Sequence, residues 1–110
     1  MPKKPEVHDI DKKSFTCGTP ETIVITGYGF TSTVTVTLKE KRYEQDHVWN
    51  PETQDVSSTG GGTQISVTST PSKSDGSPCG GFPTGDLTVT VTNSKFSKLD
   101  DMPFNVSYHS

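Results

Sequence analysis

Apolar and polar residues alternate in several short stretches of the chain, a pattern typical of β-strands with one buried face. The clearest stretch is 33–38 (Thr-Val-Thr-Val-Thr-Leu), whose apolar side chains face one way and whose threonines face the other. Similar alternation predicts strands at 22–26, 63–69, 86–93 and 104–108. One face of each strand would enter a core and the other would meet water, as antiparallel sheets allow.

Glycine and proline punctuate the segments between these strands. The text Gly27-Tyr28-Gly29-Phe30 predicts a turn that ends the strand at 22–26, and residues 57–62, which finish in three glycines, predict a hairpin turn. Residues 70–85 hold three prolines and four glycines and predict a long loop. The two Thr-Val-Thr-Val-Thr texts have different flanks, so a shared preference for strand explains them better than a repeat.

The spacing of strands and turns predicts an all-β fold. Residues 1–14 are polar and carry two prolines, so they predict a flexible lead with one edge strand at Glu6–Ile10. Residues 15–110 predict a single domain of about six to eight short strands with no convincing helix. Such a series favours a two-sheet antiparallel β-sandwich over an α/β fold.

The charged and aromatic segment 39–56 interrupts this pattern. It predicts a continued strand, a loop, and a short strand around His47–Trp49. Aromatic faces stack on sugar rings, and nearby carboxylates and amides bind hydroxyls, so this segment predicts a glycan or protein contact surface. The opposing interpretation places Trp49 in the core and Tyr43 over a sheet edge, and it is the favoured one. The candidate binding residues are Tyr43, His47, Trp49 and Asn50, with Asp46 and Gln54 beside them.

Composition limits the class of protein. A chain of 110 residues fits one domain, and with 27% hydrophobic residues its core is small. A net charge of −3 with only 10 Lys and Arg argues against a nucleic-acid partner. No apolar run reaches the roughly 18 residues of a membrane helix, so we expect no membrane insertion. The basic start at 1–5 is not followed by an apolar stretch, so no signal peptide is expected.

The segment 18–30, Gly-Thr-Pro-Glu-Thr-Ile-Val-Ile-Thr-Gly-Tyr-Gly-Phe, resembles the opening of IPT/TIG domains, the immunoglobulin-like modules of plexins, transcription factors and related proteins. The strands at 34–38 and 87–93 and the last strand from Phe104 look similar too. The resemblance implies an immunoglobulin-like sandwich. The insert at 39–56 and the loop at 70–85 depart from the compact family pattern, and loops on a rigid scaffold are where binding groups tend to lie.

In the immunoglobulin-like order that this resemblance implies, the strands after Cys17 and Cys79 would be strands B and F, which enter from the same end of the sandwich. The resemblance therefore implies a Cys17–Cys79 disulfide, and two unpaired thiols are the alternative. On the chain-entropy model a closed loop of about 60 residues adds roughly 4 kcal/mol. A disulfide would favour an extracellular or surface-exposed setting.

No enzyme motif occurs in the sequence, so we expect no catalytic residues and no cofactor. There is no Gly-x-Ser-x-Gly elbow and no His-Glu-x-x-His motif. His8, His47 and His109 are too dispersed to complete a metal site on the cysteines. Asp9, Asp11, Asp100 and Asp101 are too few for calcium and are expected to be solvated charges. Asn105-Val106-Ser107 matches the N-glycosylation sequon, with Asn105 on the outward side of its strand.

Two functions follow from these residues. The first is a non-catalytic immunoglobulin-like structural or interaction module on a cell-surface or virion-surface assembly, acting through protein contacts. The second is a carbohydrate-binding accessory module that uses Trp49 and Tyr43 as a stacking platform for a polysaccharide. The exposure of Trp49 distinguishes the two.

Overall fold

The computed structural model describes residues 5–40, 47–73, 84–93 and 99–109, and these residues form nine strands and no helix. The all-β prediction is confirmed. The strands are β1 (Glu6–Ile10), β2 (Ser14–Thr16), β3 (Glu21–Tyr28), β4 (Thr33–Glu40), β5 (His47–Asn50), β6 (Thr53–Thr59), β7 (Gln64–Lys73), β8 (Thr84–Asn93) and β9 (Leu99–His109).

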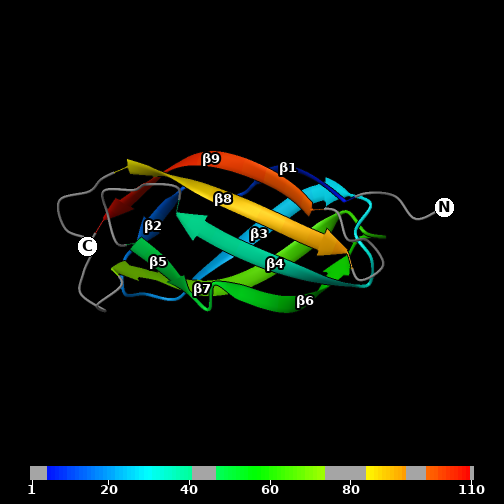
Figure 1. Cartoon of the computed structure of the whole chain (residues 1–110), viewed down its shortest axis with the longest axis horizontal. Coiled ribbons are helices and arrows are strands. Elements are labelled where there is room, and N and C mark those ends of the chain that lie inside the picture. Colours follow the sequence, from blue (N-terminus) through cyan, green and yellow to red (C-terminus); the bar gives the residue numbers. More distant parts are fainter. Residues whose placement is uncertain (1–4, 41–46, 74–83, 94–98, 110) are drawn as a thin grey trace.

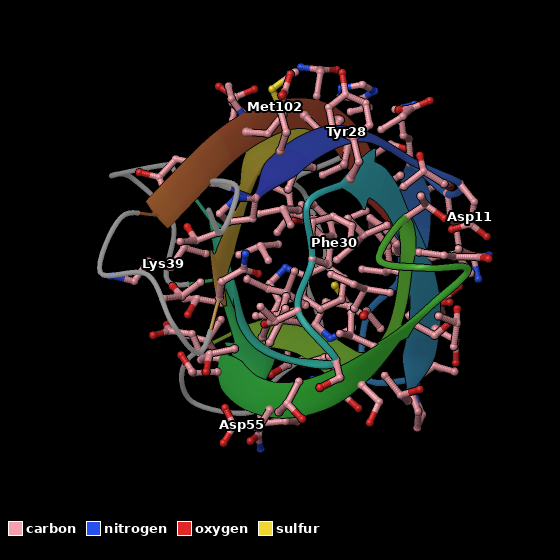
Figure 2. All side chains as sticks on the ribbon, turned by 90° about the vertical axis from the view of Figure 1, so that its right-hand side faces the viewer. Asp11, Tyr28, Phe30, Lys39, Asp55 and Met102 are labelled. Atoms are coloured by element: carbon pink, nitrogen blue, oxygen red, sulfur yellow. The ribbon has the colours of Figure 1, made fainter. Side chains whose placement is uncertain are left out.

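The strands form one curled sheet in the order β1-β3-β7-β6-β4-β8-β9-β2, with β5 paired to the far end of β7 (Figure 1). All neighbours are antiparallel except β2 and β9, which run parallel. The bend lies at β6, which pairs with β4 over 53–57 but with β7 only at Ser58 and Thr59. Seen from one end, the strands therefore surround the side chains of the core (Figure 2).

The core follows from the period-two alternation of the strands. The two Thr-Val-Thr-Val-Thr segments lie side by side in β4 and β8, with Val36 opposite Val91 and Thr35 opposite Thr92. Partners in an antiparallel pair face the same side, so the valines pack inward and the threonines face outward. The buried hydrophobic residues are Val7, Ile10, Phe15, Cys17, Ile23, Ile25, Phe30, Val34, Val36, Leu38, Trp49, Ile65, Val67, Leu87, Val89, Val91, Phe104, Val106 and Tyr108.

Several strand boundaries differ from the sequence predictions. The segment 57–62, predicted as a turn, belongs to β6 through Thr59, and the hairpin turn spans residues 60–63. Its three glycines have φ values of +65°, +72° and +88°. β6 was missed because Val56 is its one apolar residue. The predicted loop at 70–85 is also too long, because β7 continues to Lys73 and β8 begins at Thr84; residues 74–83 lie outside the described residues.

The N-terminal segment packs as part of this sheet. β1 is the strand predicted at Glu6–Ile10, and its Val7 and Ile10 side chains are in the core. The chain then leaves the edge of β3 and pairs with β9 through β2, a strand of three residues that the sequence did not predict. With β2 and β6 included, the described strands number nine, above the predicted range.

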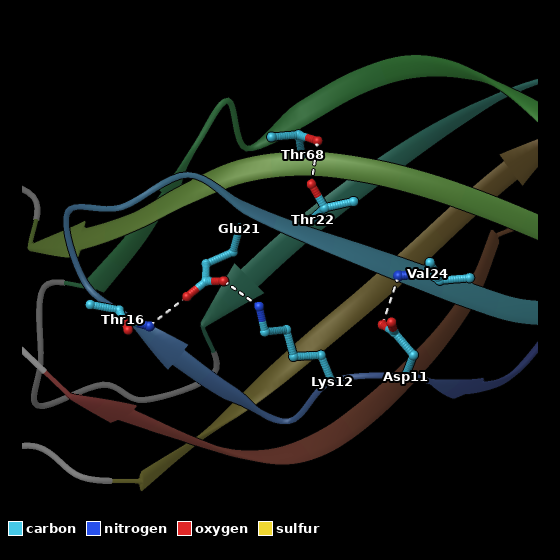
Figure 3. A network of polar contacts seen from close by, with 7 residues as sticks. All are labelled: Asp11, Lys12, Thr16, Glu21, Thr22, Val24 and Thr68. Atoms are coloured by element: carbon cyan, nitrogen blue, oxygen red, sulfur yellow. Dashed lines mark hydrogen bonds and ion pairs between the residues drawn. The ribbon is translucent and has the colours of Figure 1, made fainter.

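A polar network holds the crossover from β1 to β2 (Figure 3). The buried Glu21 carboxylate accepts a hydrogen bond from the Thr16 backbone N–H at 2.6 Å and pairs with Lys12 Nζ at 2.6 Å. The Asp11 side chain accepts from the Val24 N–H at 2.9 Å. Because Glu21 and Val24 belong to β3, both contacts tie the crossover to that strand.

Candidate functional site

Trp49, the centre of the predicted contact surface, lies in the core with 2% of its surface exposed. Its ring packs edge-on against Phe15 of β2, with ring centroids 4.9 Å apart and planes at 88°. Its Nε1–H points to the Tyr108 hydroxyl of β9 at 3.4 Å. Side chains of β2 and β9 thus cover the indole, which belongs to β5. The favoured interpretation of Trp49 as a core residue agrees with the structure. Neither face of the ring is available to a sugar.

The other candidate residues do not form a platform around Trp49. Tyr43, like the neighbouring Asp46, lies outside the described residues, and the described part of His47 is its backbone in β5. Asn50 is exposed at the end of β5. Gln54 of β6 donates a hydrogen bond to the Thr68 carbonyl of β7 at 3.1 Å, so its amide bridges two strands.

Cys17 is buried directly after β2 and is not a free thiol. Its expected partner, Cys79, lies outside the described residues, so the Cys17–Cys79 disulfide stays a prediction.

A different group of side chains is displayed at the opposite end of the sheet from β5. The large hydrophobic residues exposed there, among the residues described, are Tyr28 at 47% and Met102 at 37%. In Figure 2 both lie on the outer rim of the ring of strands, whereas Phe30 points into its centre. β9, which carries Met102, packs against β1, whose Glu6 is the cross-strand partner of Tyr28.

The backbone around Tyr28 forces this arrangement. The strand does not end before the glycine pair as predicted, since β3 continues through Tyr28. Gly27 has no room for a side chain, because a Cβ there would collide with the Glu6 carbonyl oxygen. Gly29 has φ +79°, a value that favours glycine. Between these glycines Tyr28 turns outward, and Phe30 then returns to the core.

A buried asparagine fixes the loop that follows Tyr28. Asn93, at the end of β8, is 2% exposed. Its Nδ2 donates to the Gly29 carbonyl at 2.6 Å, and its Oδ1 accepts from the Thr31 backbone N–H at 3.1 Å. The side chain thus binds one carbonyl and one N–H group of the loop that directly follows Tyr28. Ser58 of β6 also binds this loop, through the Thr31 carbonyl at 2.6 Å.

His8 and Glu6 complete the exposed cluster. The register of β1 shifts between Val7 and Asp9, so His8 sits in a β-bulge, a feature that re-aims a side chain. The His8 ring meets the Tyr28 ring edge-on at 4.4 Å between centroids. His8 Nε2 lies 3.4 Å from Glu6 Oε1. We call Glu6, His8 and Tyr28 the Tyr28 cluster.

The aspartates considered for calcium occupy separate contacts. Asp9 pairs with Lys13 Nζ at 2.8 Å, and this hydrogen bond holds the pKa of the Asp9 carboxyl below its ordinary value. Asp101 accepts from the Thr90 hydroxyl at 2.7 Å, and the Asp100 side chain is not described. Among the described residues no three acidic, histidine or cysteine side chains converge on a possible metal position.

Asn105 is exposed on β9, with its Nδ2 at 3.5 Å from Asp86 Oδ1. This is the outward orientation expected for the sequon.

The outward orientation of Tyr28 could have been predicted from the alternation of β3, although the glycines on either side of Tyr28 favour a turn. Ile23 and Ile25 are buried, so the same alternation carried forward places Tyr28 on the outer face. Because the glycines favour a turn, the predicted strand ends at Thr26, two residues before the end of β3. The bulge at His8 and the collision at Gly27 depend on the pairing of β1 with β3, which no local pattern reveals.

No protein-family model, no curated protein and no solved structure matches this chain. The resemblance to IPT/TIG domains therefore remains a prediction. In the part of the chain that is described, no helix has the length and apolar character required to span a membrane.

Proposed function

We propose that this chain is a non-catalytic immunoglobulin-like module that acts through protein contacts in a cell-surface or virion-surface assembly. The observation that carries the proposal is the Tyr28 cluster, in which a large aromatic side chain is exposed on the outer face of the sheet beside His8. Tyrosine and methionine are enriched in protein interfaces, and tyrosine loses little conformational entropy when it is bound. Exposed Met102 on the neighbouring strand extends the apolar area.

The proposed fold is a two-layer sandwich obtained by dividing the curled sheet at β6. One layer would hold β1, β3 and β7, with β5 paired to β7, and the other would hold β6, β4, β8, β9 and β2. Two features support this division. The chain passes from one layer to the other between β1 and β2, and β6 shares only two residue pairs with β7. Membership of the IPT/TIG family is part of the same proposal.

A Cys17–Cys79 disulfide would stabilise this sandwich and suit an extracellular setting. The burial of Cys17 and its lack of a free thiol support the pairing. Mass spectrometry after alkylation tests it directly. The protein should take up no iodoacetamide when denatured without reductant, and should take up two equivalents, one for each of its 2 cysteines, after reduction. Uptake without reductant would contradict the pairing.

Site-specific photocrosslinking tests the proposed function. The photoreactive residue p-benzoylphenylalanine replaces Tyr28, Met102 or, on the outer side of β6, the exposed Asp55. Each variant is then irradiated in the surface fraction or purified particles of its source. We expect a discrete protein adduct from at least one position. Absence of any protein adduct, together with retention of the chain by a soluble polysaccharide, would contradict the proposal and favour the glycan-binding alternative.

A further inference from the structure

We infer that the Tyr28 cluster recognises an arginine side chain, presented by the partner next to an apolar residue. The inference rests on the proposed function, because it assumes that the partner is a protein. It adds the chemistry of the contact and the place where the contact is made.

The charge of the cluster indicates a cationic group. Glu6 and Tyr28 are direct partners across β1 and β3, so the carboxylate and the ring lie on the same face of the sheet. Within the described residues, the Glu6 carboxylate has one nearby basic group, His8 Nε2 at 3.4 Å, and it remains mostly exposed. A ring beside a carboxylate attracts a cation in two ways, through the π-face and through an ion pair.

The desolvation of Glu6 excludes the simpler apolar partner. A purely apolar surface pressed onto Tyr28 would remove water from the adjacent carboxylate and supply no compensating charge, which is costly. An acidic partner would add repulsion. Arginine satisfies both groups at once, because its planar guanidinium stacks on an aromatic ring while its N–H groups bond a carboxylate. The net charge of −3 would favour the approach of a basic partner from a distance.

The apolar part of the partner is indicated by Met102. This side chain is 37% exposed on the same rim as Tyr28, and its strand packs against β1 (Figure 2). Thioether side chains adapt to varied apolar shapes. An apolar residue next to the arginine would thus find a complementary surface on β9.

An NMR titration of the whole chain tests the inference. The probe is acetyl-Gly-Arg-Leu-Gly-amide, and the matched control peptide replaces its arginine by glutamate. We expect the arginine peptide to shift the backbone amides of residues 6–8 and 27–29 and the glutamate peptide to leave them unchanged. Tyr28→Ala should raise the dissociation constant of the arginine peptide by about fivefold. Tyr28→Phe, which keeps the ring, should raise it by less than about twofold. Glu6→Gln should lower the affinity for the arginine peptide by about threefold and remove most of the salt dependence of its binding.

Thr22→Ala is the matched protein control, because Thr22 is exposed on the same strand and its hydroxyl contacts Thr68 at 3.0 Å. It should leave the affinity unchanged. Shifts that map to another face, or that survive Tyr28→Ala, would overturn the inference while leaving a protein-contact module in place. Absence of shifts with either peptide would also overturn it. Shifts of these amides by a soluble polysaccharide alone would overturn the inference and the proposed function together.

Discussion

The two ends of the sheet use aromatic residues in opposite ways. At the end formed by β2, β5 and the close of β9, three aromatic rings pack against one another inside the core, with Phe15–Trp49 centroids at 4.9 Å and Trp49–Tyr108 centroids at 6.4 Å. At the other end Tyr28 is 47% exposed, and among the described rings it contacts only that of His8, in a T-shaped arrangement. We call the first group the aromatic plug.

An aromatic cluster in the sequence is therefore a poor guide to a binding surface. Trp49 stands among charged residues, yet its side chain fills the core; Tyr28 stands among glycines and apolar residues, yet it is displayed. The stabilising interactions differ in kind as well. Apolar burial accounts for most of the packing of the aromatic plug, whereas the loop beside Tyr28 is held by hydrogen bonds from the buried Asn93 amide and from Ser58 of β6.

The largest effect should come from opening the aromatic plug. Trp49→Ala removes a fully buried indole and should lower the free energy of unfolding by about 3–5 kcal/mol. Tyr28→Ala, the matched half-exposed substitution, should lower it by only about 1 kcal/mol, the order of one cross-strand contact. Urea unfolding followed by far-ultraviolet circular dichroism compares the two variants. Equal losses would mean that the two ends do not differ as described.

The next effect concerns the loop beside Tyr28. Asn93→Ala removes a buried side chain and leaves the partly buried Gly29 carbonyl and Thr31 N–H without their bonds to it. We expect a loss of about 2 kcal/mol and faster amide hydrogen exchange at Thr31. The exposed Asn50→Ala is the control. Unchanged exchange at Thr31 would show that Asn93 does not order the loop.

A smaller effect should follow at the crossover near the aromatic plug. Glu21→Gln keeps the shape of the side chain but removes its charge, which weakens the bonds with Lys12 and the Thr16 N–H. We expect a loss of about 1 kcal/mol, since the Lys12 side chain is 43% exposed and its part of the interaction is screened. Lys12→Met measured alone and with Glu21→Gln gives the coupling. A strictly additive pair would contradict the ion pair.

The smallest effect is electrostatic and lies on β1. Lys13 holds the pKa of Asp9 below its ordinary value, so the folded state favours the ionised carboxylate. The stability gained from this is present above the ordinary pKa of aspartate and is lost as the pH falls through the lowered pKa. In Lys13→Ala the Asp9 pKa should rise toward the ordinary value, as measured by NMR titration of its carboxyl carbon. An unchanged pKa would show that Lys13 is not its partner.

Sequence patterns located most of the fold but little of the candidate site. Strands such as β4 and β8 were predicted because each carries several apolar residues on one side. β6 has Val56 alone, and β2 has three residues stabilised by pairing with the distant β9, so neither has a local signal. The environment of Trp49 depends on Phe15 and Tyr108, which are far away in the chain. Tertiary packing therefore determines that Trp49 is buried at one end of the sheet and Tyr28 is exposed at the other.

One experiment examines both ends of the molecule together. Photochemically induced nuclear polarisation enhances the NMR signals of tyrosine, histidine and tryptophan side chains that a flavin dye can reach in solution. Tyr28→Phe and His8→Ala assign the signals of the exposed cluster. We expect strong enhancement of the Tyr28 and His8 signals and no enhancement of those of Trp49 and Tyr108. An enhanced Trp49 signal with a silent Tyr28 would contradict this expectation, and would return the contact surface to the segment around Trp49.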